Sequence, residues 1–273
     1  MERHVKHSLI LWDRRSGTAQ DLDLIMEEPL SIRVQGKPYA VIMRTPGDER
    51  VHVAGFCFAE GIVDRPDQIV SLALCDGSDT NVVTVTLSPD RRASIAEILD
   101  RREYISQTSC GICGKALVSD LTQAITPVGN QDLKLDAAKV LERMDEMSLH
   151  QPLRNRTRAA HTALIFNQDL NLVSSAEDVG RHNALDKAIG TLFLENRLDE
   201  AFLLIMSSRL SYELIQKASR ARIPVVAAIS RPTALAVNLA ASLGMTLASK
   251  AKGVGLFVYS YPERLGIAGG PAA

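Results

Sequence analysis

Strands alternate with helices along the second half of the chain, and this rhythm limits the possible folds more than any other feature. Between short β-rich runs, apolar residues recur at helical spacing, as in the series Ala184, Leu185, Ala188, Ile189, Leu192 and Phe193. The predicted strands span residues 163–166, 170–174, 202–206, 225–229 and 255–259. An order of strand, helix, strand, helix predicts a partly parallel sheet whose faces are covered. We therefore expect an α/β core.

The first hundred residues have a different pattern, which is mainly antiparallel β. Residues 30–34 and 39–43 are β-rich runs on either side of Gly36-Lys37, and this dipeptide predicts a tight hairpin turn of the Gly-X form. Thr45-Pro46-Gly47-Asp48 predicts a helix start, and Gly61 predicts the end of that helix. A second pair of strands is predicted around a turn-rich segment, over residues 69–74 and 82–87.

This contrast divides the chain of 273 residues into two predicted domains. A smaller β-rich domain spans residues 1–100, and an α/β domain spans residues 101–273, so the fold is α/β in its core and α+β overall. The second domain opens with two stretches of helical spacing, over residues 117–125 and 137–147.

Charge and hydropathy exclude several classes of function. The chain has 31 Lys and Arg against 32 Asp and Glu, so a net charge of −1 gives no overall attraction to nucleic acid or to an acidic membrane. Its apolar runs are far shorter than the roughly 20 residues of a membrane-spanning helix, and Met1-Glu2-Arg3-His4 begins no secretory signal. We expect a cytoplasmic protein with no nucleic-acid or membrane partner, in which any anion site is local.

Two of the four cysteines form a close pair. Cys57 and Cys75 lie in or beside apolar segments and are expected to be small buried residues, whereas Cys110 and Cys113 are separated by only two residues. The segment Ser109–Lys115 also holds two glycines and a lysine, and a helix is expected to follow it, which favours a reactive thiolate. Half of a zinc site and an inert pair remain alternatives, although no second close pair of zinc ligands is visible.

Three polar turns each follow a predicted strand and carry one arginine. The turns span residues 178–183, 207–209 and 230–233, and their arginines are Arg181, Arg209 and Arg231. Ligands of α/β sheets bind outside the carboxyl ends of strands, where helix N-termini, hydroxyl groups and arginines can hold a phosphate. Alternatively, the serines and the threonine cap helices and the arginines are solvated. The pattern alone leaves both interpretations open.

Two histidines are candidate site residues. Asp178, His182 and Asp186 are spaced so that they could share one helix face, where a carboxylate would orient and charge the imidazole for acid–base work. A helix N-terminus with a His–Asp pair at the surface is the plainer alternative. His161 enters a predicted strand and is either a site residue or a hydrogen-bonded core histidine.

Six motifs spread over the chain resemble those of one known family. They are Met43–Asp48, Phe58–Ile62, Cys110–Lys115, Glu177–Lys187, Tyr212–Ala218 and Pro232–Val237. In this order they resemble the FdhD family, the sulfurtransferase accessory proteins of formate dehydrogenase. The resemblance extends from about Glu28 to Tyr259.

The resemblance implies a function in sulfur transfer. In that family a cysteine desulfurase hands a sulfane sulfur to the protein, which passes it to bis-molybdopterin guanine dinucleotide for use in formate dehydrogenase. Cys110 matches the persulfide position, and Cys113 would relay or resolve the persulfide. The family also implies a homodimer and a core similar to the cytidine deaminase fold, an α/β/α sandwich with a smaller β-rich N-terminal domain.

The resemblance also implies a site for the guanine-nucleotide end of the cofactor, for which GDP is a mimic. Its residues in this chain would be Arg181, His182, Ser207, Ser208, Arg209 and Ser230, together with the segment Lys250, Ala251, Lys252, Gly253, Val254 and Gly255. This chain departs from the family pattern at three places. Arg158 and Ala159 replace two glycines that usually precede the histidine, Ser208 replaces a glycine, and Lys250 and Lys252 replace a phenylalanine-and-arginine signature.

Two other functions compete with sulfur transfer. A zinc-dependent deaminase has a histidine and a glutamate ahead of its cysteine pair, but here the pair precedes His161 and Ala163 stands where the glutamate belongs. We therefore expect no tightly bound zinc. A cofactor chaperone that handles no sulfur would still bind guanine nucleotides, and it would tolerate the loss of both Cys110 and Cys113.

Overall fold

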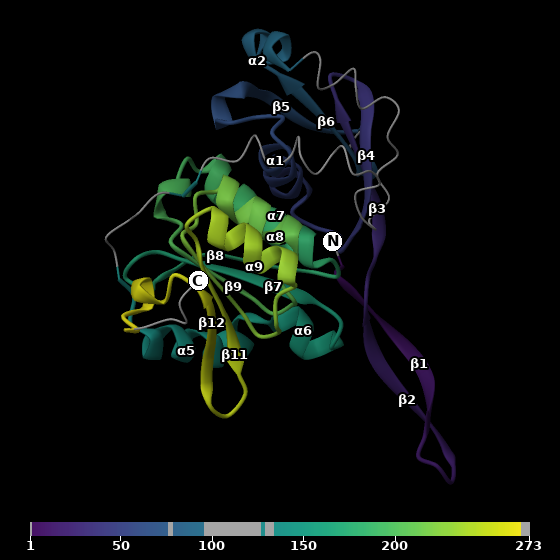
Figure 1. Cartoon of the computed structure of the whole chain (residues 1–273). Helices are drawn as coiled ribbons and strands as arrows, with labels where there is room; N and C mark the ends of the chain where they lie inside the picture. The colour runs from purple at the N-terminus through teal and green to yellow at the C-terminus, as the bar shows by residue number, and fades with distance from the viewer. Residues whose placement is uncertain (1, 76–78, 96–126, 129–133, 269–273) are drawn as a thin grey trace.

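The structure is a computed structural model that describes residues 2–75, 79–95, 127–128 and 134–268. Its strands are β1 (His4–Trp12), β2 (Gly17–Ile25), β3 (Glu28–Val34), β4 (Lys37–Arg44), β5 (Ile69–Cys75), β6 (Asp79–Leu87), β7 (His161–Phe166), β8 (Leu172–Asp178), β9 (Leu203–Met206), β10 (Val225–Ala228), β11 (Thr246–Ala251) and β12 (Gly255–Ser260). Its α-helices are α1 (Glu49–Ala59), α2 (Pro89–Ser94), α5 (Ala137–Asp145), α6 (Pro152–Thr157), α7 (Arg181–Leu194), α8 (Tyr212–Arg220) and α9 (Ala234–Ser242). Figure 1 shows their arrangement.

A six-stranded mixed sheet forms the centre of the second half, with the order β12-β11-β10-β9-β7-β8. Strands β9, β10 and β11 are parallel, whereas β7 runs antiparallel to both of its neighbours and β12 antiparallel to β11. Helices α7, α8 and α9 lie on one face of this sheet, and α5 and α6 lie on the other (Figure 1). Every residue of β9 and β10 is buried, as expected for strands covered on both faces. The prediction of a partly parallel α/β core is confirmed.

The predicted strands of this core are found in the structure, with one shift and one omission. The second begins at Leu172, because Leu170 has a left-handed backbone (φ 61°) in the preceding turn, and it continues to Asp178. Strand β11 was not predicted. Its sequence, Thr-Leu-Ala-Ser-Lys-Ala, has no strong alternation, and it becomes a strand because β10 and β12 pair with it on either side.

A four-stranded sheet, in the order β4-β3-β6-β5, covers helix α1 in the first half. Both predicted strand pairs are antiparallel, and β3 and β6 join them by parallel pairing. The predicted turn at Gly36-Lys37 is wrong. Lys37 pairs with Val34, so the two turn residues are Gln35 and Gly36, and both have positive φ (53° and 79°), as a type I′ turn requires.

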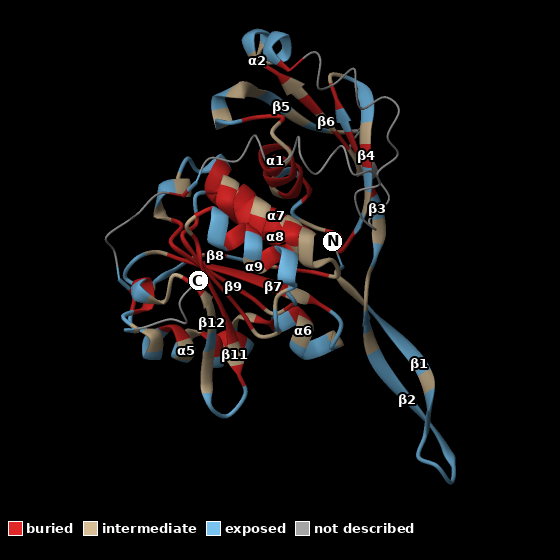
Figure 2. Ribbon diagram, viewed as in Figure 1, coloured by how far each residue is buried: buried red, intermediate tan, exposed pale blue. Residues whose placement is uncertain are grey.

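Helix α1 packs against α7, and this contact joins the two halves. One apolar core runs from Leu30 in β3 to Leu247 in β11, and Figure 2 shows both helices as largely buried. The contact is close because glycines meet there. A Cβ atom added at Gly55 would lie 1.9 Å from the backbone oxygen of Asp186, and one added at Gly190 would lie 2.0 Å from that of Val51. The domain boundary at residue 100 stays a prediction, because residues 96–126 lie outside the described ranges.

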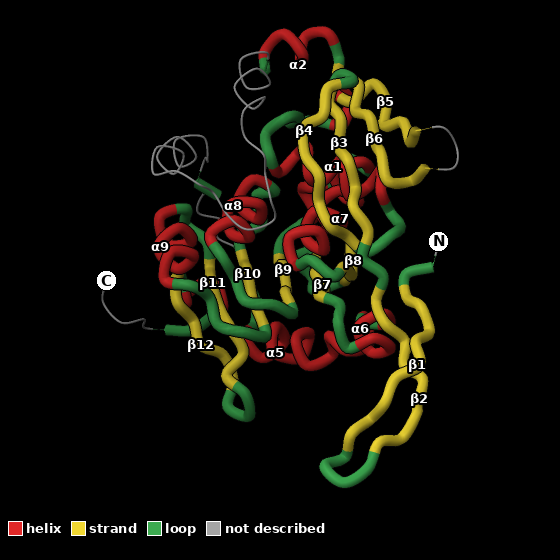
Figure 3. The backbone as a smooth tube through the Cα atoms, turned by 90° about the vertical axis from the view of Figure 1, so that its right-hand side faces the viewer, coloured by secondary structure: helices red, strands yellow, loops and turns green. Residues whose placement is uncertain are grey.

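Strands β1 and β2 form a two-stranded arm that the sequence pattern did not predict. It projects away from the rest of the molecule, as Figures 1 and 3 both show. Contacts near its base attach it, since Arg3 donates a hydrogen bond to the backbone oxygen of Glu177, and Arg156 of α6 forms an ion pair with Asp23 at 2.8 Å. None of the helices in the described ranges is long and apolar enough to cross a membrane.

Candidate functional site at the carboxyl edge of the sheet

The sheet topology brings the three predicted polar turns to one edge. Strands β8 and β9 both run antiparallel to β7, so β8 has the same direction as β9, β10 and β11. The residues that follow Asp178, Met206, Ala228 and Ala251 therefore all lie at one edge, where β7 begins with His161. We call this the carboxyl edge.

The first turn of helix α7 has no side-chain cap. Its N-cap residue is Gly180, which has no side chain to accept a hydrogen bond from the first amides of the helix. Beside it, Nε of Arg181 is buried and has no hydrogen-bond partner among the described residues. Uncapped amides and a guanidinium nitrogen without a partner in the described part of the chain suit an anionic ligand at a helix N-terminus.

His161 faces the same edge and also has an unpaired nitrogen. Its Nδ1 is buried without a partner among the described residues, so His161 is not a hydrogen-bonded core histidine. Partial burial, with the nearby charges of Arg154 and Arg181, lowers the pKa of His161, so the ring is neutral at pH 7. A neutral ring can either donate or accept one hydrogen bond at Nδ1, depending on its tautomer.

The predicted sharing of a helix face by Asp178, His182 and Asp186 is wrong. His182 Nε2 lies 3.0 Å from a carboxylate oxygen of Glu213 and 3.3 Å from the hydroxyl of Ser211, both from the start of α8. The hydrogen bond with His182 lowers the pKa of Glu213. Asp178 and Asp186 are buried and instead pair with Lys187 and Lys217. Strand β8 ends at Asp178, so Asp178 is not on the helix at all.

The three predicted serines differ in the hydrogen bonds that their hydroxyl groups already make. The hydroxyl of Ser207 accepts the amide of Thr162 at 2.9 Å, and Ser208 is buried with its hydroxyl donating to the backbone oxygen of Arg209. Ser230 is half-buried. None of these three caps a helix, but Thr233 does, since it accepts the amide of Ala236. The capping interpretation therefore holds for the threonine alone.

The cations of the edge are spread along it. Arg209 is exposed, and Arg231 lies over the ring of Phe257 with 5.1 Å between the guanidinium carbon and the ring centre. Lys250 is turned toward α5, where it forms an ion pair with Asp145. Residues 252–254 form the β11–β12 turn, in which Lys252 and Gly253 are exposed and Val254 is 91% exposed. Ala251 is buried and Gly255 is half-buried.

The length of the edge limits what can bind there. Four strand-to-strand steps separate β8 from β11, which at the usual spacing is about 19 Å. One phosphate cannot contact both the start of α7 and the β11–β12 turn. A ligand that uses all the predicted residues must be long and must carry more than one polar group.

The predicted cysteine pair, Cys110 and Cys113, lies outside the residues that the structure describes. Cys57 is fully buried in α1, and burial strongly raises the pKa of its thiol, so this cysteine is not a nucleophile. Within the described ranges, no group of three or more His, Cys, Asp and Glu side chains could hold a metal ion. The expectation of no tightly bound zinc stays a prediction, since it concerns the cysteine pair.

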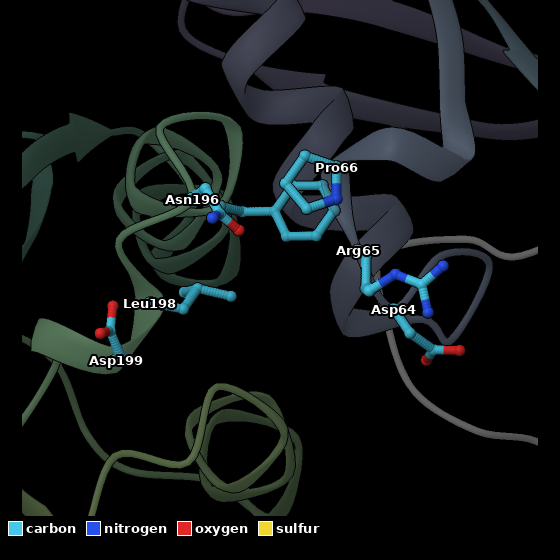
Figure 4. Close-up of a pocket in the computed structure, with 7 residues that line it drawn as sticks. Asp64, Arg65, Pro66, Asn196, Leu198 and Asp199 are labelled. Carbon is cyan, nitrogen blue, oxygen red and sulfur yellow. The ribbon is translucent and has the colours of Figure 1, made fainter.

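A surface groove lies at the other end of α7 and is a weaker candidate. Figure 4 shows it between the segment that follows α1 and the segment that follows α7, lined by Asp64, Arg65, Pro66, Phe193, Asn196, Leu198 and Asp199. Its charged groups already have partners in part, since Asp64 pairs with Arg220 and Arg65 with Asp67. The groove has none of the unpaired buried polar atoms that mark the carboxyl edge.

Comparison with known proteins identifies the family. The family model described as "FdhD/NarQ family" matches residues 25–266. The chain belongs to the FdhD/NarQ family. It is 38% identical to the sulfur carrier protein FdhD of Streptomyces avermitilis over 89% of each chain, and 37% identical to that of Xanthomonas euvesicatoria over 95% of this chain and 92% of that protein. The resemblance inferred from the six motifs is confirmed.

A solved structure supports the fold. The crystal structure of a proposed formate dehydrogenase accessory protein from Desulfotalea psychrophila matches with a TM-score of 0.76, 22% identity and coverage of 97% of this chain and all of that one. Arg158 has a left-handed backbone (φ 60°) at the end of α6, a conformation that glycine adopts more readily than arginine.

Proposed function

We propose that this protein carries sulfur from a cysteine desulfurase to bis-molybdopterin guanine dinucleotide, for use in formate dehydrogenase or a related molybdoenzyme. The observation that carries the proposal is the match to the FdhD/NarQ family over residues 25–266, which includes Cys110 and Cys113. Relatives that share more than a third of their residues with this chain are named sulfur carrier proteins. The protein would work in the cytoplasm, where thiols stay reduced.

The transfer step needs no added oxidant. The thiolate of Cys110 attacks the outer sulfur of the persulfide on the desulfurase, a new sulfur–sulfur bond forms on Cys110, and the desulfurase cysteine leaves as a thiolate. Cys113 lies close enough in sequence to relay or resolve the persulfide. Cys57 cannot replace them, because its thiol is buried and remains protonated.

Intact-mass analysis after incubation with a desulfurase and free cysteine tests this assignment. We expect the mass of one added sulfur on the wild type, its loss in Cys110→Ala, and its retention in the control Cys57→Ala. An adduct that survives in Cys110→Ala would contradict the assignment. If Cys110→Ala, Cys113→Ala and the double variant Cys110→Ala/Cys113→Ala all still restore formate dehydrogenase activity, the protein is a cofactor chaperone instead.

We propose that the carboxyl edge binds the guanine-nucleotide end of the cofactor. The uncapped start of α7 and the unpaired nitrogens of Arg181 and His161 support this, and the length of the edge suits a long ligand with several polar groups. The remaining contacts would come from His182, Ser207, Ser208, Arg209, Ser230 and the segment Lys250–Gly255. Ser207 already accepts one hydrogen bond and Ser208 already donates one, so each hydroxyl can offer the ligand only its remaining hydrogen-bonding capacity.

Calorimetric titration with GDP tests the nucleotide site. Charge-assisted hydrogen bonds contribute about 1.5 to 3 kcal/mol each, so Arg181→Ala and Arg209→Ala should each weaken binding by roughly 10- to 100-fold. Arg222→Ala provides the control, because Arg222 is exposed in the turn between α8 and β10, at the opposite edge of the sheet. Equal affinities in all the variants, or no binding by the wild type, would rule this site out.

We also propose that the protein is a homodimer and that its core is related to the cytidine deaminase fold, with the domain boundary near residue 100. The exposed arm supports the dimer. Val5, Leu9 and Leu11 of β1 share one face with Leu22 and Leu24 of β2. His7, Thr18 and Gln20 also lie on this face, whereas Lys6, Asp21 and Asp23 all lie on the other one. A mainly apolar face without Lys, Arg, Asp or Glu is typical of a permanent interface between two copies.

A further inference from the structure

The motif Met43–Asp48 lies against the turn that starts helix α7, although the two are about 135 residues apart in the sequence. Thr45 is completely buried and makes three hydrogen bonds across this contact. Its amide donates to the carboxylate of Asp178 at 3.1 Å, its hydroxyl accepts the amide of Val179 at 3.0 Å, and its backbone oxygen accepts the ammonium group of Lys187 at 2.9 Å.

The contact extends to the rest of the turn. The side-chain amide of Asn183 donates to the backbone oxygen of Met43 at 2.7 Å and to Asp178 at 2.9 Å. Asp178 also accepts the amide of Gly180 at 2.9 Å and pairs with Lys187 at 2.8 Å, and both of these charged side chains are buried. The backbone from Asp178 to Gly180 is therefore held from the N-terminal half of the molecule.

We infer that Thr45 is a positioning residue for the ligand-binding start of α7, an inference that rests on the nucleotide site proposed above. The hydroxyl of Thr45 fixes the peptide that joins Asp178 to Val179, one residue before the uncapped Gly180 and two before Arg181. It thereby sets the direction of the free helix amides and of the arginine. Thr45 itself is fully buried and does not contact the ligand.

Thr45→Val is the sharpest variant, because it keeps the shape and both backbone contacts and removes only the hydroxyl. A buried amide left without an acceptor favours other orientations of the turn, so we expect the affinity for GDP to fall about five- to tenfold. Thr45→Ser keeps the hydroxyl and should bind GDP within about twofold of the wild type. A double-mutant cycle with Arg181→Ala should show that the two losses are not additive.

A control separates positioning from loss of stability. Ser174 is buried in β8, and its hydroxyl donates to the backbone oxygen of Ala188 at 2.8 Å. Ala188 lies in α7, far from the turn that starts this helix. Ser174→Ala should lower the melting temperature as much as Thr45→Val does, and it should leave the affinity for GDP unchanged. If Thr45→Val binds GDP as the wild type does, or if Ser174→Ala weakens binding equally, Thr45 has no positioning role.

Hydrogen exchange keeps the inference testable apart from the nucleotide site. In the free protein, the amides of Val179 and Gly180, which are hydrogen-bonded in the wild type, should exchange faster in Thr45→Val than in Ser174→Ala and the wild type, because only Thr45→Val releases the turn. Unchanged exchange would overturn the inference. A wild type that does not bind GDP would overturn the nucleotide site, and exchange would still decide whether Thr45 holds the turn.

Discussion

The two strand pairs nearest the N-terminus have similar lengths and opposite surroundings. In the β3–β4 hairpin, Leu30, Ile32 and Val34 face α1 and are buried, whereas in the arm Val5, Leu11, Leu22 and Leu24 are between 40% and 48% exposed. Figure 2 shows the arm as mostly exposed, whereas buried residues appear in the sheet beside α1. Alternating strands thus occur both where a helix covers them and where nothing in the described part of the chain does.

The difference shows how the N-terminal hundred residues divide in physical terms. Residues 28–95 are fixed to the rest of the molecule by the α1–α7 contact, by the hydrogen bonds of Thr45 and by the ion pair between Asp64 and Arg220. The arm adds little apolar contact, and an isolated two-stranded hairpin has marginal stability in water. Stability should therefore depend strongly on α1 and α7 and weakly on the arm.

The largest effect is expected at the crossing of α1 and α7. In Gly190→Ala the new Cβ would lie 2.0 Å from the backbone oxygen of Val51, so the helices must separate. We expect a loss of about 5 kcal/mol or more in the free energy of unfolding, measured by urea titration. Helix propensity alone predicts a gain of about 1 kcal/mol, so a stabilised variant would show that the helices do not meet closely.

A smaller loss is expected from the buried pair beside this crossing. Lys217 lies 2.8 Å from Asp186 and 4.0 Å from Glu60, and although desolvation opposes it, these carboxylates raise the pKa of Lys217. Lys217→Met leaves Asp186 buried without its cation and should cost roughly 3 to 4 kcal/mol. Lys217→Met/Asp186→Leu should recover most of that loss in urea titration. A double variant as unstable as the single one would mean that packing, not charge, is responsible.

The third effect appears only in acid. His52 of α1 is completely buried, and desolvation, followed by the charges of Lys187, Lys217 and Arg44, lowers its pKa well below 6.5. Below pH 6.5, His52 therefore binds a proton in the unfolded chain but not in the folded chain. The free energy of unfolding falls as the pH drops through and below this value. The melting temperature of the wild type should decline more steeply between pH 7 and about pH 5 than that of His52→Leu. Parallel declines would exclude His52 as the cause.

The smallest effect on stability is expected in the arm. Leu22→Ser changes an exposed residue, so the free energy of unfolding of the monomer should change by no more than about 0.5 kcal/mol. The same variant should dissociate the proposed dimer in sedimentation equilibrium, whereas Lys6→Ala, on the charged face of the arm, should not. A wild type that sediments as a monomer, or a Leu22→Ser variant that stays dimeric, would mean that the arm's apolar face does not join two copies.

Local pattern was enough for most of the elements near the carboxyl edge. The helix that starts after Asp48 and ends before Gly61 is found as α1, and apolar spacing from Ala184 to Phe193 is found as α7. The arm was not predicted, because one face of its two strands carries apolar residues that are exposed and the opposite face carries charged residues. The β11 strand was missed because its neighbours, and not its own alternation, make it a strand.

By itself, the sequence determined the α/β rhythm, the family and the three polar turns with their arginines, because periodicity and turn chemistry are local properties of a chain. Tertiary structure alone decided the partners of the charged groups. Glu213, and not a neighbouring aspartate, pairs with His182, and Thr45 holds a turn more than a hundred residues away. Such partners are set by which strands and helices pack together, and that depends on burial across the whole core.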